Sequence, residues 1–206
     1  MVVVKFLFRI ANLSWALLLS AGAVADDLTK LNGYLSQMDG VVSSFVQTIS
    51  DPSGTVVERS VGQLHLQKPQ VRWEVSEPFP QVILLGHERD LRIYDPDLEQ
   101  VTERLLGEDW AQVPLALLTQ SDLDLSGRFD VRLVSTGLFE LTPTAPQALF
   151  QKVLLSFDGA ALKGIRITDQ GGQITLIEFE HFLANQVIPA EKFELTLPPG
   201  TEIVRG

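Results

Sequence analysis

Residues 62–75 read GQLHLQKPQVRWEV, and apolar and polar side chains alternate along both halves of this segment. In the first half, Leu64 and Leu66 flank a histidine. In the second half, three apolar residues take alternate positions, namely Val71, Trp73 and Val75. Because successive side chains of a strand point to opposite faces of a sheet, this period of two predicts strands with one buried face.

The same period continues along most of the chain on either side of this segment. It recurs at Leu91 and Ile93, Val131 and Leu133, Val153, Leu155 and Phe157, Ile165 and Ile167, Ile174 and Leu176, and Phe193, Leu195 and Leu197. Turn signals rich in Asp, Pro and Gly separate the runs, as at residues 51–54, 95–97 and 170–172. We therefore expect a mainly β protein with a meander of about ten or eleven antiparallel strands.

Few helices are available to cover these strands. Near the amino terminus, apolar residues recur at helical spacing: Leu28, Leu31, Leu35 and Met38. We expect a helix that opens at Asp26 or Asp27 and stops at Gly40. A second short helix is expected around Pro114, which suits a first helical turn. Its apolar face would be formed by Leu115 and Leu118.

The balance between strands and helices leaves two arrangements open. The apolar strand faces form a large surface, and two or three short helices cannot cover all of it. Either the sheet folds onto itself as a sandwich, or it curls around an incompletely filled hollow. The residue pattern alone favours the sandwich, because most apolar strand faces are packed core.

The amino terminus has the three-part layout of an export signal. Two basic residues precede an apolar stretch at residues 10–19, and small residues ending at Ala25 precede two acids. We expect residues 1–25 to be a cleavable signal peptide and residues 26–206 to be a single domain. A membrane anchor is disfavoured, because the apolar stretch is shorter than the ~20 residues that span a bilayer.

Composition excludes several kinds of function. Without Lys5 and Arg9 of the signal, 14 basic residues stand against 26 acidic ones, a net charge of −12 that disfavours nucleic acid and anionic membranes as partners. The chain has no Cys and only three widely spaced His, so neither a disulfide nor a metal centre is expected. No phosphate-binding loop, nucleophile elbow or zinc-protease helix occurs, and we expect neither a cofactor nor enzymatic activity.

A series of short motifs runs through the whole mature chain. In order they are SFVQ at 44–47, GQL at 62–64, KP at 68–69, RW at 72–73, IYDPDLEQV at 93–101, VP at 113–114 with LL at 117–118, FEL at 193–195 and PPG at 198–200. In this order and spacing they resemble the periplasmic outer-membrane lipoprotein carrier family of Gram-negative bacteria. The resemblance implies an unclosed half β-barrel with a helical lid over an apolar cavity.

The resemblance also implies a shuttle for triacylated lipoproteins. An inner-membrane, ATP-driven releasing complex of the ABC type would load the carrier, and an outer-membrane receptor would accept the cargo. Each methylene withdrawn from water is worth ~0.8 kcal/mol, so three acyl chains need cover while they cross the periplasm. The carrier would be a soluble, monomeric periplasmic protein that changes no covalent bond.

Specific residues follow from the same resemblance. The acyl-chain cavity would be lined by Leu35, Val41, Val71, Trp73, Val75, Leu115 and Leu118. Lys68 stands where the family usually has an Arg that latches the lid by hydrogen bonds to helix backbone. Because Lys has no planar fork of donors, it could satisfy fewer carbonyls and give a looser closed state. The alternatives are ordinary core for the apolar residues and a solvated strand-end charge for Lys68.

Two details remain open in these assignments. One residue fewer separates Pro69 from Trp73 than in the family pattern, which leaves the register of Val71 undecided. The second functional hypothesis is a lipid- or lipoprotein-sensing regulatory domain of the same half-barrel fold. Such domains usually share their chain with a membrane anchor or a cytoplasmic domain, and no second hydrophobic span occurs in this sequence. An envelope hydrolase is disfavoured, because no nucleophile, base and orienting group can be assembled.

Overall fold

The computed structural model describes residues 21–86, 90–106, 116–119 and 125–206, apart from the side chains of residues 21–25 and 116–117. Its strands form one sheet of twelve. They are β1 (Val41–Ser50), β2 (Val56–Gln67), β3 (Gln70–Glu77), β4 (Gln81–Leu85), β5 (Asp90–Asp95), β6 (Gln100–Leu105), β7 (Phe129–Ser135), β8 (Leu138–Pro143), β9 (Phe150–Asp158), β10 (Ala161–Asp169), β11 (Ile174–Leu183) and β12 (Glu202–Arg205).

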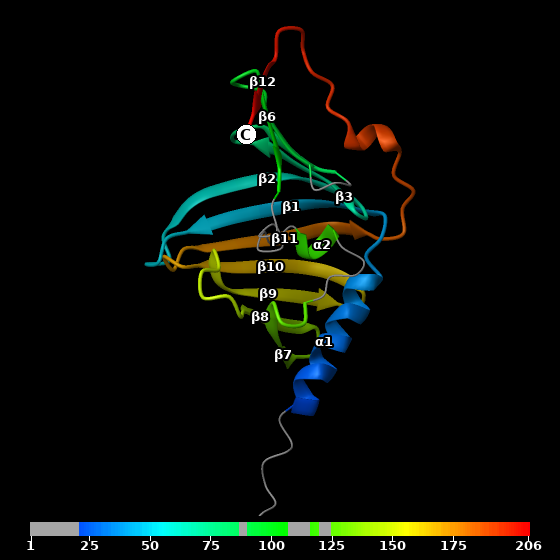
Figure 1. The fold of residues 1–206 in the computed structure, drawn as a ribbon, viewed down its shortest axis with the longest axis vertical. Helices are drawn as coiled ribbons and strands as arrows, with labels where there is room; N and C mark the ends of the chain where they lie inside the picture. The colour runs from blue at the N-terminus through cyan, green and yellow to red at the C-terminus, as the bar shows by residue number, and fades with distance from the viewer. Residues whose placement is uncertain (1–20, 87–89, 107–115, 120–124) are drawn as a thin grey trace, which may run out of the picture.

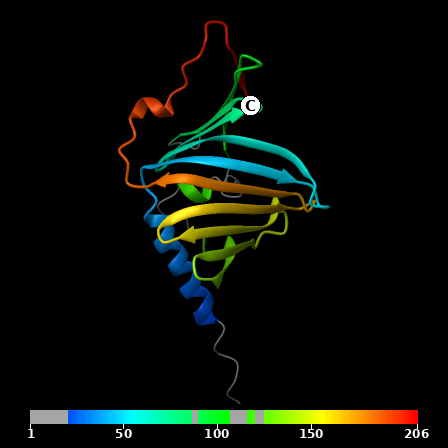
Figure 2. The same cartoon turned by 180° about the vertical axis from the view of Figure 1, so that it is seen from behind.

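The sheet is strongly curved and open. Its strand order is β12-β6-β5-β4-β3-β2-β1-β11-β10-β9-β8-β7, so β12 and β7 lie at opposite ends (Figures 1 and 2). Neighbouring strands are antiparallel, as between β1 and β2, except that β12 runs parallel to β6. The unclosed half-barrel is therefore confirmed. The sandwich, which the residue pattern alone favoured, is wrong because all twelve described strands share one sheet.

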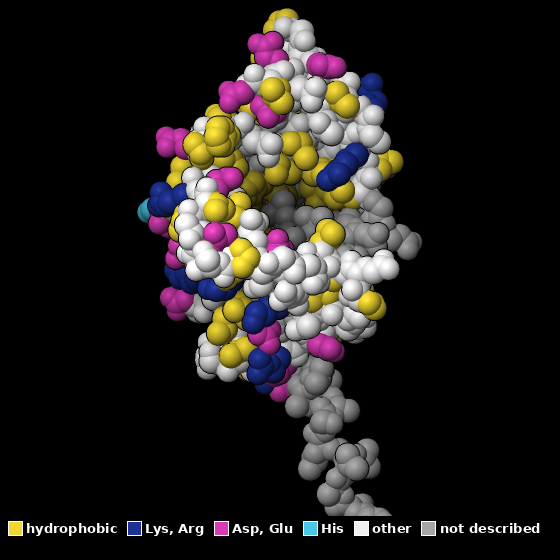
Figure 3. Space-filling view, turned by 90° about the vertical axis from the view of Figure 1, so that its left-hand side faces the viewer, with side chains coloured by type: hydrophobic (Ala, Val, Ile, Leu, Met, Phe, Trp, Pro, Cys, Tyr) yellow, Lys and Arg dark blue, Asp and Glu magenta, His cyan; other side chains and the backbone are white. Residues whose placement is uncertain are grey.

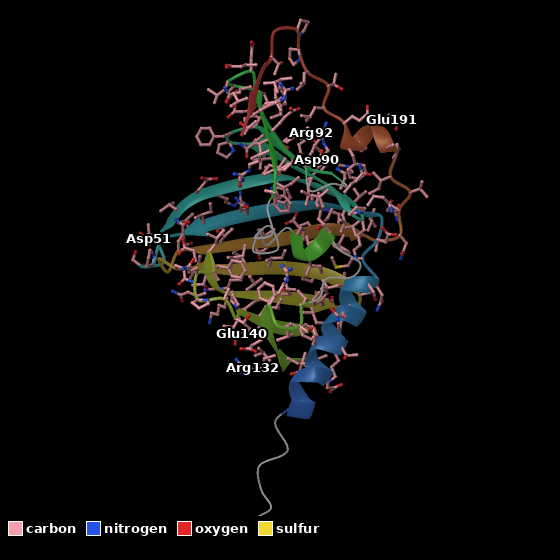
Figure 4. All side chains as sticks on the ribbon, in the orientation of Figure 1. Asp51, Asp90, Arg92, Arg132, Glu140 and Glu191 are labelled. Carbon is pink, nitrogen blue, oxygen red and sulfur yellow. The ribbon has the colours of Figure 1, made fainter. Side chains whose placement is uncertain are left out.

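Turn residues fix the ends of the long central hairpins. Between β1 and β2, one carboxylate oxygen of Asp51 accepts hydrogen bonds from the backbone N–H groups of Ser53 and Thr55, both at 2.9 Å. These hydrogen bonds lower the pKa of Asp51, and the bond from the Ser53 hydroxyl has the largest effect, ahead of the bond from the Thr55 backbone. Figure 4 shows Asp51 at the tip of this hairpin, on the side of the molecule away from the amino-terminal helix.

That helix, α1 (Ala21–Ser36), packs at the other end of the half-barrel (Figure 1). It begins at Ala21 rather than at Asp26 or Asp27, since the preceding alanines favour helix. It ends at Ser36, before Gly40, and the Ser36 hydroxyl and the Gln37 amide both donate to the Gly33 carbonyl at 3.0 Å. Residues 1–20 of the expected signal peptide lie outside the described residues.

Among the described residues two further helical segments are short: α2 (Ala116–Thr119) and the 3-10 turn η2 (Ala190–Phe193). The expected start of the second helix at Pro114 lies outside the described residues. Within the part of the chain that the structure describes, no helix combines the length and the hydrophobicity that a bilayer crossing requires.

The carboxyl-terminal segment differs from its predicted form. Phe193, Leu195 and Leu197 alternate like a strand, but the structure has η2 followed by irregular chain. The prediction was wrong, since no described strand pairs with this segment; the Arg72 guanidinium instead donates to its backbone carbonyls, to Lys192 at 3.4 Å and to Glu194 at 3.3 Å. The last strand is instead β12, whose four exposed residues carry no periodic signal.

Candidate functional site

The concave face of the half-barrel collects the apolar side of each strand. Trp73 lies opposite Leu64, and Val71 lies opposite Leu66, so the pairing of β2 with β3 is unbroken up to the turn at Lys68. In this sheet Val71 therefore lies on the same face as Trp73. The three residues expected to share a face do share it: Val71 and Trp73 are buried, and Val75 is partly buried against the same hydrophobic cluster.

Aromatic rings join neighbouring strands across this face. The ring of Phe45 crosses Gly62 and stacks on Trp73 with centroids 3.8 Å apart. A Cβ at Gly62 would lie 2.5 Å from Phe45 Cζ, so only glycine leaves room for this crossing. The Trp73 ring also packs edge-to-face with the ring of Phe179 from β11, with centroids 6.3 Å apart. Phe45 and Phe179 were not predicted as site residues, although Phe45 belongs to the SFVQ motif.

Helix α1 covers part of the concave face with its own apolar side. Leu31 and Leu35 are buried in the same hydrophobic cluster as Val71 and Trp73. Tyr34 packs its ring against Phe139 and Phe157, with centroid distances of 5.5 and 4.7 Å. The helix therefore occupies apolar surface that would otherwise be exposed.

The remaining predicted lining residues have mixed outcomes. Val41, at the start of β1, and Leu118, in α2, are fully buried in the hydrophobic cluster. Leu115 lies outside the described residues. The structure thus brings Leu35, Val41 and Leu118 into one core with the strand residues, and their role as an acyl-chain lining stays a prediction.

Lys68 joins the β2–β3 turn to α1. Its Nζ donates a hydrogen bond to the Leu35 carbonyl oxygen at 2.6 Å. Burial lowers the pKa of Lys68, and the nearby Asp39 carboxylate opposes this shift. Asp39 in turn accepts from the Gln67 side chain at 2.8 Å. The contact with Leu35 therefore holds the Lys68 ammonium partly out of water, and the desolvation of the charge costs free energy. Separation of α1 from the β2–β3 turn would remove that cost.

The chain leaves α1 for β1 through a tightly fixed connection. Gly40 has a φ of +56°, and a Cβ there would lie 2.0 Å from the Gln186 carbonyl oxygen. Backbone bonds from Asn185 to Asp39, at 2.8 Å, and from Gln186 to Gly40, at 2.7 Å, hold this connection to the segment after β11. The carboxyl-terminal end of α1 is thus the anchored end of the helix.

A cavity of about 440 Å³ opens beside the aromatic rings. Its lining is mixed: Trp73, Val75 and Ile83 are apolar residues of β3 and β4, and polar groups complete it, namely Gln47, Glu58, Ser60, Gln81, Asp95 and Asp97. Phe79 and Leu98 also line it and are 71% and 69% exposed. On the face seen in Figure 3 the molecule is hollowed near its centre, and hydrophobic side chains gather around the hollow. Pockets for drug-sized ligands measure roughly 300–1,000 Å³, so the volume of this cavity falls toward the lower end of that range.

The described residues contain no group of three His, Asp or Glu side chains that could hold a metal ion. The concave face offers a ligand apolar surface, and the cavity beside it adds carboxylate, amide and hydroxyl groups. A curved, unclosed sheet whose apolar concave face is partly covered by a helix defines a class of protein: half-barrels that enclose apolar groups beneath a helical lid.

Comparison with known sequences assigns the family. Residues 36–196 match the family described as outer membrane lipoprotein carrier protein LolA, and the chain belongs to this family. An outer-membrane lipoprotein carrier protein of Pseudomonas fluorescens is 31% identical over 191 residues, covering 91% of this chain and 92% of the relative. A protein of the same name from Dechloromonas aromatica is 32% identical over 193 residues, covering 91% and 90%.

Solved structures show the same fold at low sequence identity. A putative outer membrane lipoprotein-sorting protein domain from Vibrio parahaemolyticus has a TM-score of 0.51 and 9% identity, covering 84% of this chain and 97% of that one. MucB has a TM-score of 0.50 and 17% identity, covering 88% and 70%. At these identities the likeness extends to the fold alone.

Proposed function

We propose that this protein carries lipoproteins to the outer membrane by holding their acyl chains against its concave face. The observation that carries the proposal is the position of α1, whose buried Leu31 and Leu35 cover apolar strand surface in a sheet that is open at both ends. Acyl chains and the helix would compete for this surface. The names of the relatives support lipoproteins as the cargo.

The cellular route is part of the proposal. After removal of residues 1–25 the protein works in the periplasm, takes its cargo from an inner-membrane ATP-driven releasing complex, and passes it to an outer-membrane receptor. The sequence contains no nucleotide-binding loop, so the energy of loading enters through the partner complex. Onward transfer then runs toward a receptor that binds the acyl chains more tightly.

Lys68 is the proposed latch of the empty state. Its bond to the Leu35 carbonyl favours the closed lid, while the partial burial of its ammonium limits that preference. A charged donor contributes about 1–2 kcal/mol in such a bond, a small energy beside the burial of an acyl chain. Cargo can therefore open the lid, and the closing lid helps to expel it.

The direct test is to isolate the protein from the periplasm of cells that produce lipoproteins and to measure its intact mass under non-denaturing conditions. We expect a complex with one lipoprotein. A matched cargo whose lipid-bearing cysteine is replaced by serine should not be retained. Empty carrier from cells with abundant lipoprotein, or equal retention of the two cargoes, would overturn the proposal.

A further inference from the structure

The amino-terminal part of α1 is bonded to the last strand of the sheet. The Asp27 carboxylate accepts a hydrogen bond from the Leu133 backbone N–H at 2.9 Å, across 106 positions of sequence. β7 ends the strand order and pairs with β8 through its other side. An edge strand leaves N–H groups without sheet partners, and Asp27 supplies one of them with an acceptor.

The other side of β7 is held by different contacts. Arg132 and Glu140 point toward one another from β7 and β8 and form an ion pair at 2.7 Å (Figure 4). The ladder between β7 and β8 and this ion pair do not involve α1. Breaking the bond between Asp27 and Leu133 would therefore remove one contact that holds the helix and leave the strand in the sheet.

The two neighbouring acids at this end of α1 have different partners. Lys30 forms a hydrogen-bonded ion pair with Asp26, and its Nζ lies farther, 3.7 Å, from Asp27. The Asp26 side chain is 61% exposed, whereas that of Asp27 is 20% exposed. The Lys30 contact of Asp27 uses Oδ1, so its Oδ2 accepts from the strand.

Position along the helix gives this bond a particular effect. The Lys68 contact is made at Leu35, close to the anchored connection at Gly40. Asp27 lies eight residues earlier, roughly 12 Å farther along the helix axis. Any rotation of α1 about its anchored end displaces Asp27 more than it displaces Leu35. The bond to β7 must break when the helix swings away from the sheet.

We propose that Asp27 is a second tie of the lid, a positioning residue that holds the free end of α1 to β7 while the site is empty. Entry of acyl chains breaks the tie and frees the Leu133 N–H. This inference rests on the proposed function, since it requires a ligand that displaces the helix. Lys68 and Asp27 then hold α1 at two points to opposite halves of the half-barrel.

The test follows the Leu133 amide by hydrogen exchange in the exported protein, free and after loading with a triacylated lipopeptide. We expect loading to accelerate its exchange about tenfold or more, while amides of β1 and β11 stay protected. In free protein, Asp27→Ala should accelerate the same amide and the uptake of lipopeptide, the latter about fivefold, as expected for one lost hydrogen bond. Asp26→Ala is the matched control and should change neither.

Asp27→Asn keeps an acceptor oxygen and should restore protection of the Leu133 amide. Lipopeptide that binds while this amide stays protected would overturn the tie and leave the carrier function standing. Failure of wild-type protein to bind any lipopeptide would overturn both proposals. Equal effects of Asp26→Ala and Asp27→Ala would also overturn the tie, because among the described residues Asp26 makes no hydrogen bond to the sheet but shares the contact with Lys30.

Discussion

The Lys68 ammonium lies 2.6 Å from the carbonyl oxygen of Leu35 and so joins the β2–β3 turn to the last turns of α1. The contact links the two parts of the molecule that must separate if the concave face is to admit a ligand. Its donor is half-buried and its pKa is lowered by that burial. The bond is thus suited to a closed state that is favoured but easily opened.

Removing this donor should uncouple loading from release. We expect Lys68→Leu to take up acylated lipopeptide at least as fast as wild type but to deliver it to the receptor at least about fivefold more slowly, because a hydrogen bond of about 1–2 kcal/mol no longer favours the closed lid. Lys68→Arg is the matched variant and should transfer at least as fast as wild type, since its fork can reach further acceptors. Normal transfer by Lys68→Leu would refute the latch.

Trp73 should report the arrival of cargo. Its ring lies between Phe45 and the cavity, so acyl chains entering there would change its surroundings. The chain has three tryptophans, and Trp110→Phe in protein without residues 1–25 leaves Trp73 alone. We expect its emission to shift when a triacylated lipopeptide is added and to stay constant with the unacylated peptide. An unchanged spectrum with binding shown independently would remove Trp73 from the lining.

Replacement by alanine should have opposite effects on stability at two glycines, Gly62 beneath the Phe45 ring and Gly33 in α1. Gly62→Ala places a methyl group 2.1 Å from the Glu74 carbonyl oxygen and 2.5 Å from the ring, and should lower the free energy of unfolding by about 1–3 kcal/mol. Gly33 is in α1, where an added Cβ would have no neighbour within 4 Å. Gly33→Ala should therefore raise the free energy of unfolding by up to about 1 kcal/mol. Urea unfolding monitored by circular dichroism compares them, and effects of the same sign would contradict this packing.

His65 should make stability depend on pH. It lies on the outer face of β2 with 7% exposure, and within the described residues its Nδ1 has no hydrogen-bond partner. Burial is the main cause that lowers the pKa of His65, and the Lys192 and Arg72 cations lower it further. The Glu74 carboxylate raises this pKa by a smaller amount.

The unfolded chain therefore binds a proton at His65 more readily than the folded protein does. The stabilising contribution of this residue is complete above about pH 6.5, the ordinary histidine value, and declines as the pH falls below it. Urea midpoints measured from pH 8 to pH 5 should fall less steeply in His65→Gln than in wild type. Parallel pH profiles of the two proteins would show that His65 does not carry this effect.

Alternation along single strands was enough to predict much of the fold. A period of two places Val71, Trp73 and Val75 on one face whatever the sheet does at larger scale, and the structure keeps them there. The same alternation fits a sandwich and a half-barrel equally well, because it says nothing about what covers the apolar face. The half-barrel and its lid came from the family motifs.

Interactions between distant segments were beyond the sequence pattern. Phe193 and its neighbours alternate like a strand, yet Arg72 of β3 binds the backbone around η2. The contact of Asp27 with Leu133, and the passage of Phe45 over Gly62, depend on register and curvature that no local pattern contains. Lys68 was found only because it occupies a family position.

The central claim is that acyl chains lie against the concave face, and site-specific cross-linking tests it most directly. A photo-reactive phenylalanine derivative is placed at Val75, which lines the cavity, or at Gln63, which is exposed on β2. Each protein is illuminated with a triacylated lipopeptide. The account predicts a covalent adduct on the acyl chains from position 75 and little from position 63. Equal adducts from both positions, or an adduct from position 63 alone, would contradict it.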